Sequence, residues 1–183
     1  QIMQAKETRL DSIIEGTKQY VVPLFQRSYS WTKKEWDILW NDICDLYEME
    51  NPRVHFFGSI VNMPATSVPE GVAKFLLIDG QQRLTTVFIL LSILKDLALE
   101  GKKERLSDEI KNTLLLNQYK DGYDHYKMMP TQVDRNAFLK VIEGQGHEAD
   151  GQIGQAWKYL EKKVRTSNFD IENIKKILTQ KFS

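Results

Sequence analysis

A short polar cluster at Asp79–Arg83 contains residue types that bind phosphate groups. The cluster follows the apolar stretch 75–78, which predicts a strand, and it opens a strongly apolar stretch at 82–99, which predicts a helix. Free N–H groups and the positive dipole end at a helix start favour an anion. Arg83 adds a planar set of donors for phosphate oxygens, and Asp79 can hold a divalent cation such as Mg²⁺. The pattern predicts a polyphosphate site.

Gly80 permits a tight turn, and Gln81 and Gln82 could hydrogen-bond a nucleotide or orient a water. The same residues also allow a purely structural interpretation. An Asp beside a helix start is favoured for stability alone, by about 1 kcal/mol, and Arg83 could simply pair with it. Two amides and a guanidinium lie next to one another at the start of a very apolar helix. This arrangement favours a ligand-binding role over a purely structural one.

A second candidate segment, Val22–Trp31, follows a short β-rich stretch at Tyr20–Pro23. Arg27 in this segment is surrounded by aromatic residues and could reach the same phosphate. Tyr29 or Trp31 could then stack on a nucleobase. The alternative is that the aromatic residues are core and Arg27 lies across them, and Trp31 fits the core better.

Several predicted elements must position these two segments. Thr32 and Glu35 form a capping box that opens a helix at 33–50. His55–Met63 and Lys74–Ile78 predict two strands that pair in antiparallel fashion, because only a short loop connects them. The helix at 82–99 is apolar nearly all round and should lie at the centre of the fold. Further helices are predicted at 5–16, 104–113, 131–143, 150–166 and 170–181, with a short β-like piece at Tyr126–Met129.

Composition narrows the class of protein. The 183 residues are 42% hydrophobic and 27% charged, as in ordinary globular domains. The 25 Lys and Arg balance the 25 Asp and Glu, which argues against a strongly basic nucleic-acid-binding protein. A single cysteine, Cys44, excludes an internal disulfide and a cysteine-based zinc site, and it favours a reducing, cytoplasmic setting. No apolar run approaches the roughly 20 residues of a membrane-spanning helix, so we expect no membrane partner.

Four segments in order along the chain resemble the N-terminal domain of GmrSD-type restriction endonucleases. The resemblance covers about residues 8–145, and the run Asp-Gly-Gln-Gln-Arg at Asp79–Arg83 is the hallmark of that family. The four segments are Val22–Trp31, His55–Val61, Ile78–Thr86 and Met129–Phe138.

The resemblance implies an α+β fold of the ParB/sulfiredoxin-like type. Its small mixed or antiparallel sheet is packed by helices and followed by a mainly helical part. We therefore expect a nucleotide-binding core at 1–103 and a helical region at 104–183, after which the natural protein continues.

The resemblance also implies a site for a nucleoside triphosphate of unspecified base, hydrolysed with Mg²⁺ that Asp79 would hold. The residues implied to be catalytic are Asp79, Gln81, Gln82 and Arg83. The resemblance places Gly80 in the nucleotide site with Gln26 and Arg27 facing it, and we expect Tyr29 and Thr85 to bind the nucleotide as well.

The implied role is a regulatory NTPase domain of a modification-dependent restriction or phage-defence protein. Modified DNA would be reached through the full-length protein and cut by a separate C-terminal His-Asn-His nuclease domain, in cis or in trans. One alternative is a DNA-sensing module without turnover that uses the basic region 150–183, which carries seven basic and four acidic residues. Another is a ParB-like nuclease acting through Asp79, although a two-metal site usually needs several carboxylates.

Overall fold

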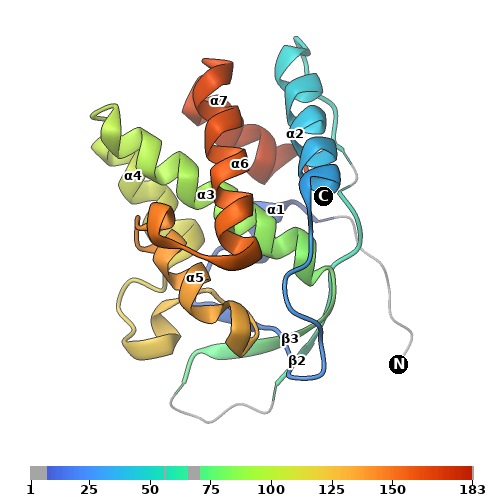
Figure 1. Ribbon diagram of the computed structural model, residues 1–183, viewed down its shortest axis with the longest axis vertical. Coiled ribbons are helices and arrows are strands. Elements are labelled where there is room, and N and C mark those ends of the chain that lie inside the picture. The colour runs from blue at the N-terminus through green and yellow to red at the C-terminus, as the bar shows by residue number, and fades with distance from the viewer. Residues whose placement is uncertain (1–7, 56, 66–70, 183) are drawn as a thin grey trace.

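The computed structural model describes residues 8–55, 57–65 and 71–182, and it has an α+β fold with a small mixed sheet packed by helices (Figure 1). The strands are β1 (Lys18–Val21), β2 (Val61–Pro64), β3 (Ala73–Asp79) and β4 (Met128–Met129). Their order is β2-β3-β1-β4. The predicted fold class is confirmed, whereas the specific likeness to ParB and sulfiredoxin stays a prediction.

Strand direction gathers three loops on one side of the sheet. β1 runs parallel to both β3 and β4, and β2 pairs with β3 in antiparallel fashion, as predicted. The carboxyl ends of the three parallel strands therefore meet at one edge. We call this the carboxyl edge and define it as the three segments that follow β1, β3 and β4, namely Val22–Trp31, Gly80–Arg83 and Pro130–Arg135.

The helices pack against the sheet and around one central helix. The α-helices are α1 (Leu10–Ile14), α2 (Lys33–Glu48), α3 (Gln81–Glu100), α4 (Glu104–Ile110), α5 (Gln132–Ile142), α6 (Gly151–Ser167) and α7 (Ile171–Lys176). π-helical turns follow α4 and α7 at Lys111–Leu115 and Ile177–Lys181, and short 3₁₀ turns occupy Gly122–His125 and Gly146–Glu148. In the described part of the chain, no helix is both long enough and apolar enough to cross a membrane.

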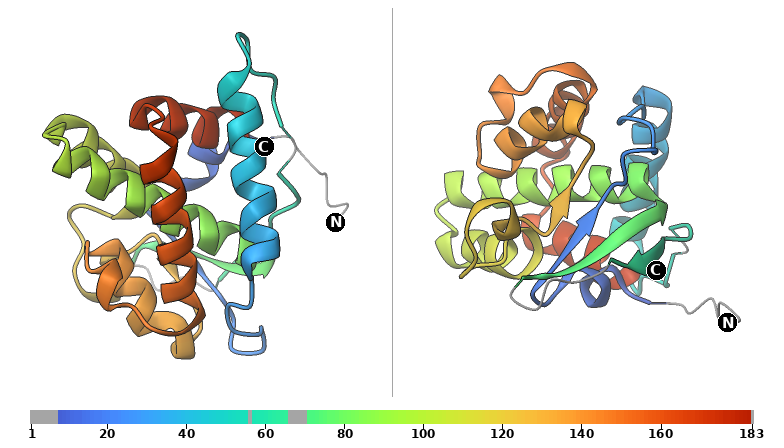
Figure 2. Two further views of the ribbon diagram at one scale, coloured as in Figure 1. Left: turned by 45° about the horizontal axis from the view of Figure 1, so that its top comes forward. Right: turned by 90° about the horizontal axis from the view of Figure 1, so that it is seen from below.

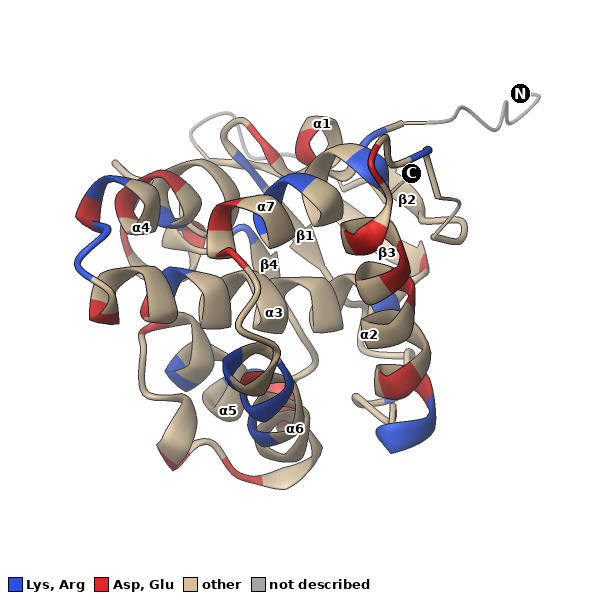
Figure 3. Ribbon diagram, turned by 90° about the horizontal axis from the view of Figure 1, so that it is seen from above, with Lys and Arg blue, Asp and Glu red and all other residues tan. Residues whose placement is uncertain are grey.

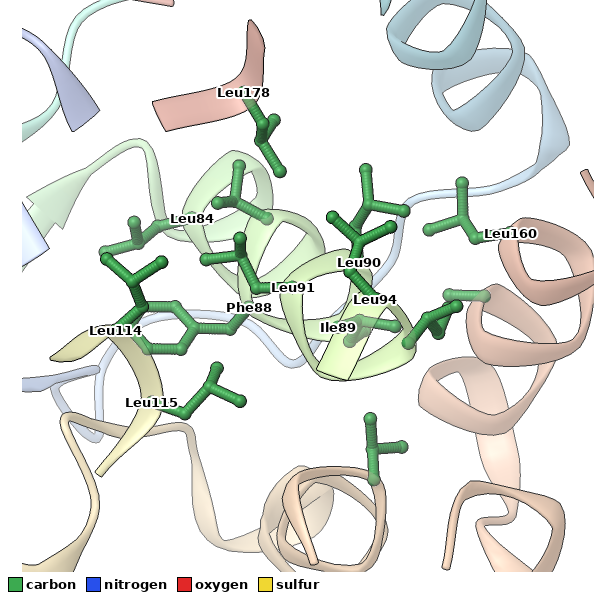
Figure 4. Packing of buried hydrophobic residues seen from close by; sticks show 14 of the residues in the cluster. Leu84, Phe88, Ile89, Leu90, Leu91, Leu94, Leu114, Leu115, Leu160 and Leu178 are labelled. Carbon is green, nitrogen blue, oxygen red and sulfur yellow. The ribbon is translucent and has the colours of Figure 1, made fainter. Parts of the chain in front are cut away.

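α3 is the centre of the hydrophobic core, as its sequence predicts. β3 leads directly into α3, which crosses the middle of the molecule (Figure 2). Residues from Leu84 to Lys95 are buried without a break, so the helix needs apolar or paired groups on every face. Leucines from the turn after α4, from α6 and from the last turn of the chain surround it (Figure 4). The Phe88 and Phe138 rings meet edge to face, with centroids 6.3 Å apart.

Several predicted boundaries differ from the observed ones. The helix predicted at 5–16 is observed as α1, and residues 1–7 lie outside the described chain. The strand predicted at His55–Met63 is observed only from Val61 onward, while His55 forms an isolated parallel bridge with Phe182. Gly58 breaks the extended run because its φ is +122°, which side-chain-bearing residues rarely adopt.

The two predicted parts of the chain share one sheet and one core. β4 lies beyond residue 103 but pairs with β1, which makes β1 an interior strand. Pro23 does not interrupt this strand, because it follows the strand end at Val21. The hydrophobic cluster includes residues from both sides of the predicted boundary at 103, so that boundary passes through a continuous packed unit.

Candidate functional site at the carboxyl edge

The turn from β3 into α3 places Asp79 at the surface of the carboxyl edge. Gly80 is the N-cap of α3 with φ +88°, and a Cβ there would lie 2.9 Å from the Ser59 carbonyl oxygen. Asp79 Oδ1 accepts a hydrogen bond from the Gly80 N–H at 2.8 Å. The Asp79 side chain therefore stabilises the turn through one oxygen, while the exposed carboxylate keeps its second oxygen available to a ligand.

Arg83 lies against the loop before β2 rather than against Asp79. Its Nη2 donates to the Ser59 carbonyl, and a Cβ on Gly58 would lie 2.7 Å from Arg83 Nε. Nε is buried and has no hydrogen-bond partner among the described residues. In the same described ranges, no carboxylate forms an ion pair with this guanidinium. Arg83 thus has unused donors and no carboxylate partner in the described chain at the start of α3.

Gln82 holds the Val22–Trp31 segment in place. Its Oε1 accepts from the N–H groups of Ser30 at 2.8 Å and Trp31 at 3.3 Å, and its Nε2 donates to the Ser28 carbonyl at 3.2 Å. The side chain is 8% exposed. Both ends of the amide are engaged with backbone, so Gln82 positions the loop rather than a water or a nucleotide. The catalytic role predicted for it finds no free polar atom to carry it.

Gln81 and Gln26 link the same loop to the sheet. Gln81 Nε2 donates to Gln26 Oε1 at 3.2 Å, and Gln26 Nε2 donates to the Ile78 carbonyl at 3.2 Å. Gln26 therefore lies next to the first residue of α3, and its predicted role in nucleotide binding stays a prediction. Arg27, the next residue, is exposed beside this amide pair.

Tyr29 belongs to the core, and the predicted stacking role fails for a geometric reason. The residue is 6% exposed, and its hydroxyl bonds to Thr86 Oγ1 at 2.6 Å and accepts from Trp36 Nε1 at 2.8 Å. Burial raises the pKa of this hydroxyl above its usual range. Its ring has no open face for a nucleobase. Trp31 is half-buried against the core, as its core interpretation predicts.

Thr85 is buried and does not line the candidate site. The side chain is 3% exposed, and its hydroxyl donates to the Gln81 carbonyl at 2.7 Å. This bond back to the preceding turn is a local helix contact. The nucleotide-binding role predicted for Thr85 therefore has no support in its surroundings.

The start of α5 belongs to the third segment of the carboxyl edge. Its hydrogen bond to the Val22–Trp31 segment was not predicted from the sequence. Asp134 is 8% exposed, and its Oδ2 accepts from the Tyr29 N–H at 2.7 Å and from Thr131 Oγ1 at 3.2 Å. Arg135 donates to the Pro130 carbonyl at 3.3 Å and lies 5.3 Å from the Tyr123 ring centroid. The sequence signal at this place is Thr131 three residues before Asp134. That spacing marks a helix start, but it does not indicate that Asp134 bonds to the distant Tyr29.

A sequence model of the GmrSD restriction endonuclease N-terminal domain matches residues 10–182. The chain belongs to this family. A search of curated proteins gives no match. The matched range includes all four strands, so the carboxyl edge of this GmrSD N-terminal domain lies entirely inside the family region.

The residues of the carboxyl edge suit a cation that binds together with a phosphate ligand better than a permanently bound metal ion. Over the ranges that the structure describes, no group of three His, Cys, Asp or Glu side chains could hold a metal ion. Asp79 is the sole carboxylate of the Asp-Gly-Gln-Gln-Arg motif. Mg²⁺ commonly binds through one or two carboxylates together with substrate phosphate oxygens and water. Asp79 can serve in that way, whereas a two-metal nuclease site usually needs several carboxylates, and no group of three metal-ligating side chains is found among the described residues.

Three of the seven basic residues in the region 150–183 are paired with carboxylates, namely Arg165, Lys175 and Lys176. Arg165 bonds to both carboxylate oxygens of Glu100, at 3.0 and 2.7 Å, and it also pairs with Glu161. Lys175 pairs with Glu109. Basic segments alternate with acidic ones over α4 and α7 (Figure 3). These pairs reduce the positive charge available to a DNA backbone.

Proposed function

We propose that this GmrSD N-terminal domain binds a nucleoside triphosphate with Mg²⁺ at the carboxyl edge and hydrolyses it. The observation that carries the proposal is the Arg83 guanidinium, which lies beside the start of α3 with a buried, unpartnered Nε and no carboxylate partner in the described chain. A cation left in this state at a helix start favours a phosphate ligand.

The polar residues of the edge then divide into two groups. Arg83 and the first free N–H groups of α3 would bind phosphate oxygens, and the outer oxygen of Asp79 would hold the Mg²⁺. The amides of Gln26, Gln81 and Gln82 would keep the surrounding loop in place through the contacts described above.

Hydrolysis at such a site needs little covalent chemistry from the protein. A water oxygen attacks the γ-phosphorus, and the bond to the bridging β–γ oxygen breaks. Mg²⁺, when bound, supplies neutralisation of the phosphate charge. Arg83 contributes by stabilising the negative charge that develops in the transition state, which is the usual source of catalysis in phosphoryl transfer.

In the proposed role, nucleotide turnover regulates a restriction protein that acts on modified DNA in the cytoplasm. DNA cleavage would belong to a His-Asn-His nuclease domain in cis or in trans. Family membership supports the connection to restriction. The DNA-sensing alternative is weakened because Arg165, Lys175 and Lys176 are paired with carboxylates, and the nuclease alternative is weakened because the described residues hold no group of three potential metal ligands.

Phosphate release from a nucleoside triphosphate tests the proposal. The wild-type chain should release phosphate only with Mg²⁺, and Asp79→Asn should reduce the rate at least about tenfold, a loss of about 1.4 kcal/mol in transition-state stabilisation. Asn can still accept the hydrogen bond from the Gly80 N–H, so folding should be unaffected. A rate that is unchanged in both Asp79→Asn and Arg83→Ala, or no turnover of any nucleoside triphosphate by the wild type, would refute the assignment.

A further inference from the structure

Two large apolar side chains occupy the tip of a tight turn at the carboxyl edge. The Gln26 N–H donates to the Pro23 carbonyl at 3.0 Å, which closes a four-residue turn around Leu24 and Phe25. Leu24 is 91% exposed and Phe25 is 76% exposed. Turn tips usually carry Gly, Asn, Asp or Ser, so this pair is unusual for a tip that serves only to reverse the chain.

The turn is held firmly against the nucleotide site. Gln26 bonds through its amide to both the Ile78 carbonyl and Gln81, the first residue of α3. Neighbouring Cα atoms are about 3.8 Å apart. Phe25 is therefore one residue away from a side chain that touches the helix start, and its ring is presented at the surface on an anchored backbone.

Phe25 differs from the other aromatic residues of the same segment. Tyr29 is buried with its hydroxyl bonded inside the core, and Trp31 is half-buried against it. Phe25 has neither restriction, and Arg27 follows two residues later with its side chain exposed. Phe25 is thus the one mainly exposed ring of this segment, and the next residue, Gln26, bonds to the first residue of α3.

We propose that the Phe25 ring is the surface on which the base of the bound nucleotide stacks. The inference rests on the proposed nucleotide site and adds the residue that recognises the base. Stacking on an aromatic ring accepts every base, because every base has a π-face. Phe25 therefore contributes affinity for a nucleoside triphosphate and none for a phosphate chain that lacks a base.

Two ligands and two variants separate base stacking from phosphate binding. Dissociation constants are measured in Mg²⁺ for adenosine triphosphate and for inorganic tripolyphosphate. Phe25→Ala should weaken adenosine triphosphate binding at least about fivefold, the lower end for base–aromatic stacking, and leave tripolyphosphate binding unchanged. Phe25→Trp should retain the affinity for adenosine triphosphate. Leu24→Ala is the matched control, because it removes an equally exposed apolar side chain from the same turn, and it should change neither constant.

The outcomes distinguish this inference from the function on which it rests. Equal weakening of both ligands by Phe25→Ala, no weakening of either, or the same effect from Leu24→Ala overturns the stacking role while the phosphate site stands. Failure of both ligands to bind the wild-type chain removes the nucleotide site, and the stacking role falls with it. Because Phe25 is mainly exposed, the melting temperature of Phe25→Ala should match that of the wild type.

Discussion

Replacing Gln82 by Ala should lower stability, because this side chain holds the Val22–Trp31 segment to α3. Three hydrogen bonds to backbone are lost. At a net value of about 1 kcal/mol each, they amount to about 3 kcal/mol. Water can reach the exposed Ser28 and Ser30, which reduces the expected loss to about 1.5–3 kcal/mol. For a chain of this size, that corresponds to a fall in melting temperature of about 3–12 °C.

Urea unfolding measures this effect directly. The midpoint should fall with little change in the slope, since the surface exposed on unfolding is nearly the same. Gln155→Ala is the matched control, because Gln155 is exposed on α6 and its loss should stay within about 0.5 kcal/mol. A Gln82→Ala midpoint equal to that of Gln155→Ala would refute the positioning role, and a loss of turnover at unchanged stability would restore a catalytic one.

Two further predictions concern the turn and a buried amine. Gly80→Ala should cost at least about 1 kcal/mol in urea unfolding, because the position has φ +88° and a Cβ would lie 2.9 Å from the Ser59 carbonyl; unchanged stability would contradict that geometry. Burial lowers the pKa of the Lys127 amine to about 8, so between pH 8 and 10 the unfolded chain binds more protons and stability should rise with pH. Lys127→Met should reduce that rise, and an identical pH dependence in the variant would show that Lys127 does not cause it.

The patterns that succeeded are those set by local chemistry. The capping box of Thr32 and Glu35 opens α2 as predicted, and the apolar run after Gly80 forms the buried central helix. The turn between β3 and α3 was likewise predictable, since an apolar strand, a glycine and an apolar helix follow one another directly. Each of these features depends on residues close in sequence.

The features that could not be predicted depend on distant partners. β4 has only two residues, and nothing in Met128–Met129 indicates that they pair in parallel with β1. The role of Gln82 likewise depends on backbone groups more than 50 positions away. Sequence spacing also could not distinguish buried Tyr29 from exposed Phe25, because both lie in one aromatic segment and tertiary packing alone separates them.

The most direct test of the central claim is the thermal shift produced by a nucleoside triphosphate with Mg²⁺, compared between the wild type and Arg83→Ala. At a ligand concentration about 100-fold above the dissociation constant, binding adds about 2.7 kcal/mol to stability. The wild-type melting temperature should then rise by about 5–11 °C. In Arg83→Ala most of that rise should disappear at the same ligand concentration. An equal rise in both proteins would contradict the assignment of the phosphate site to Arg83.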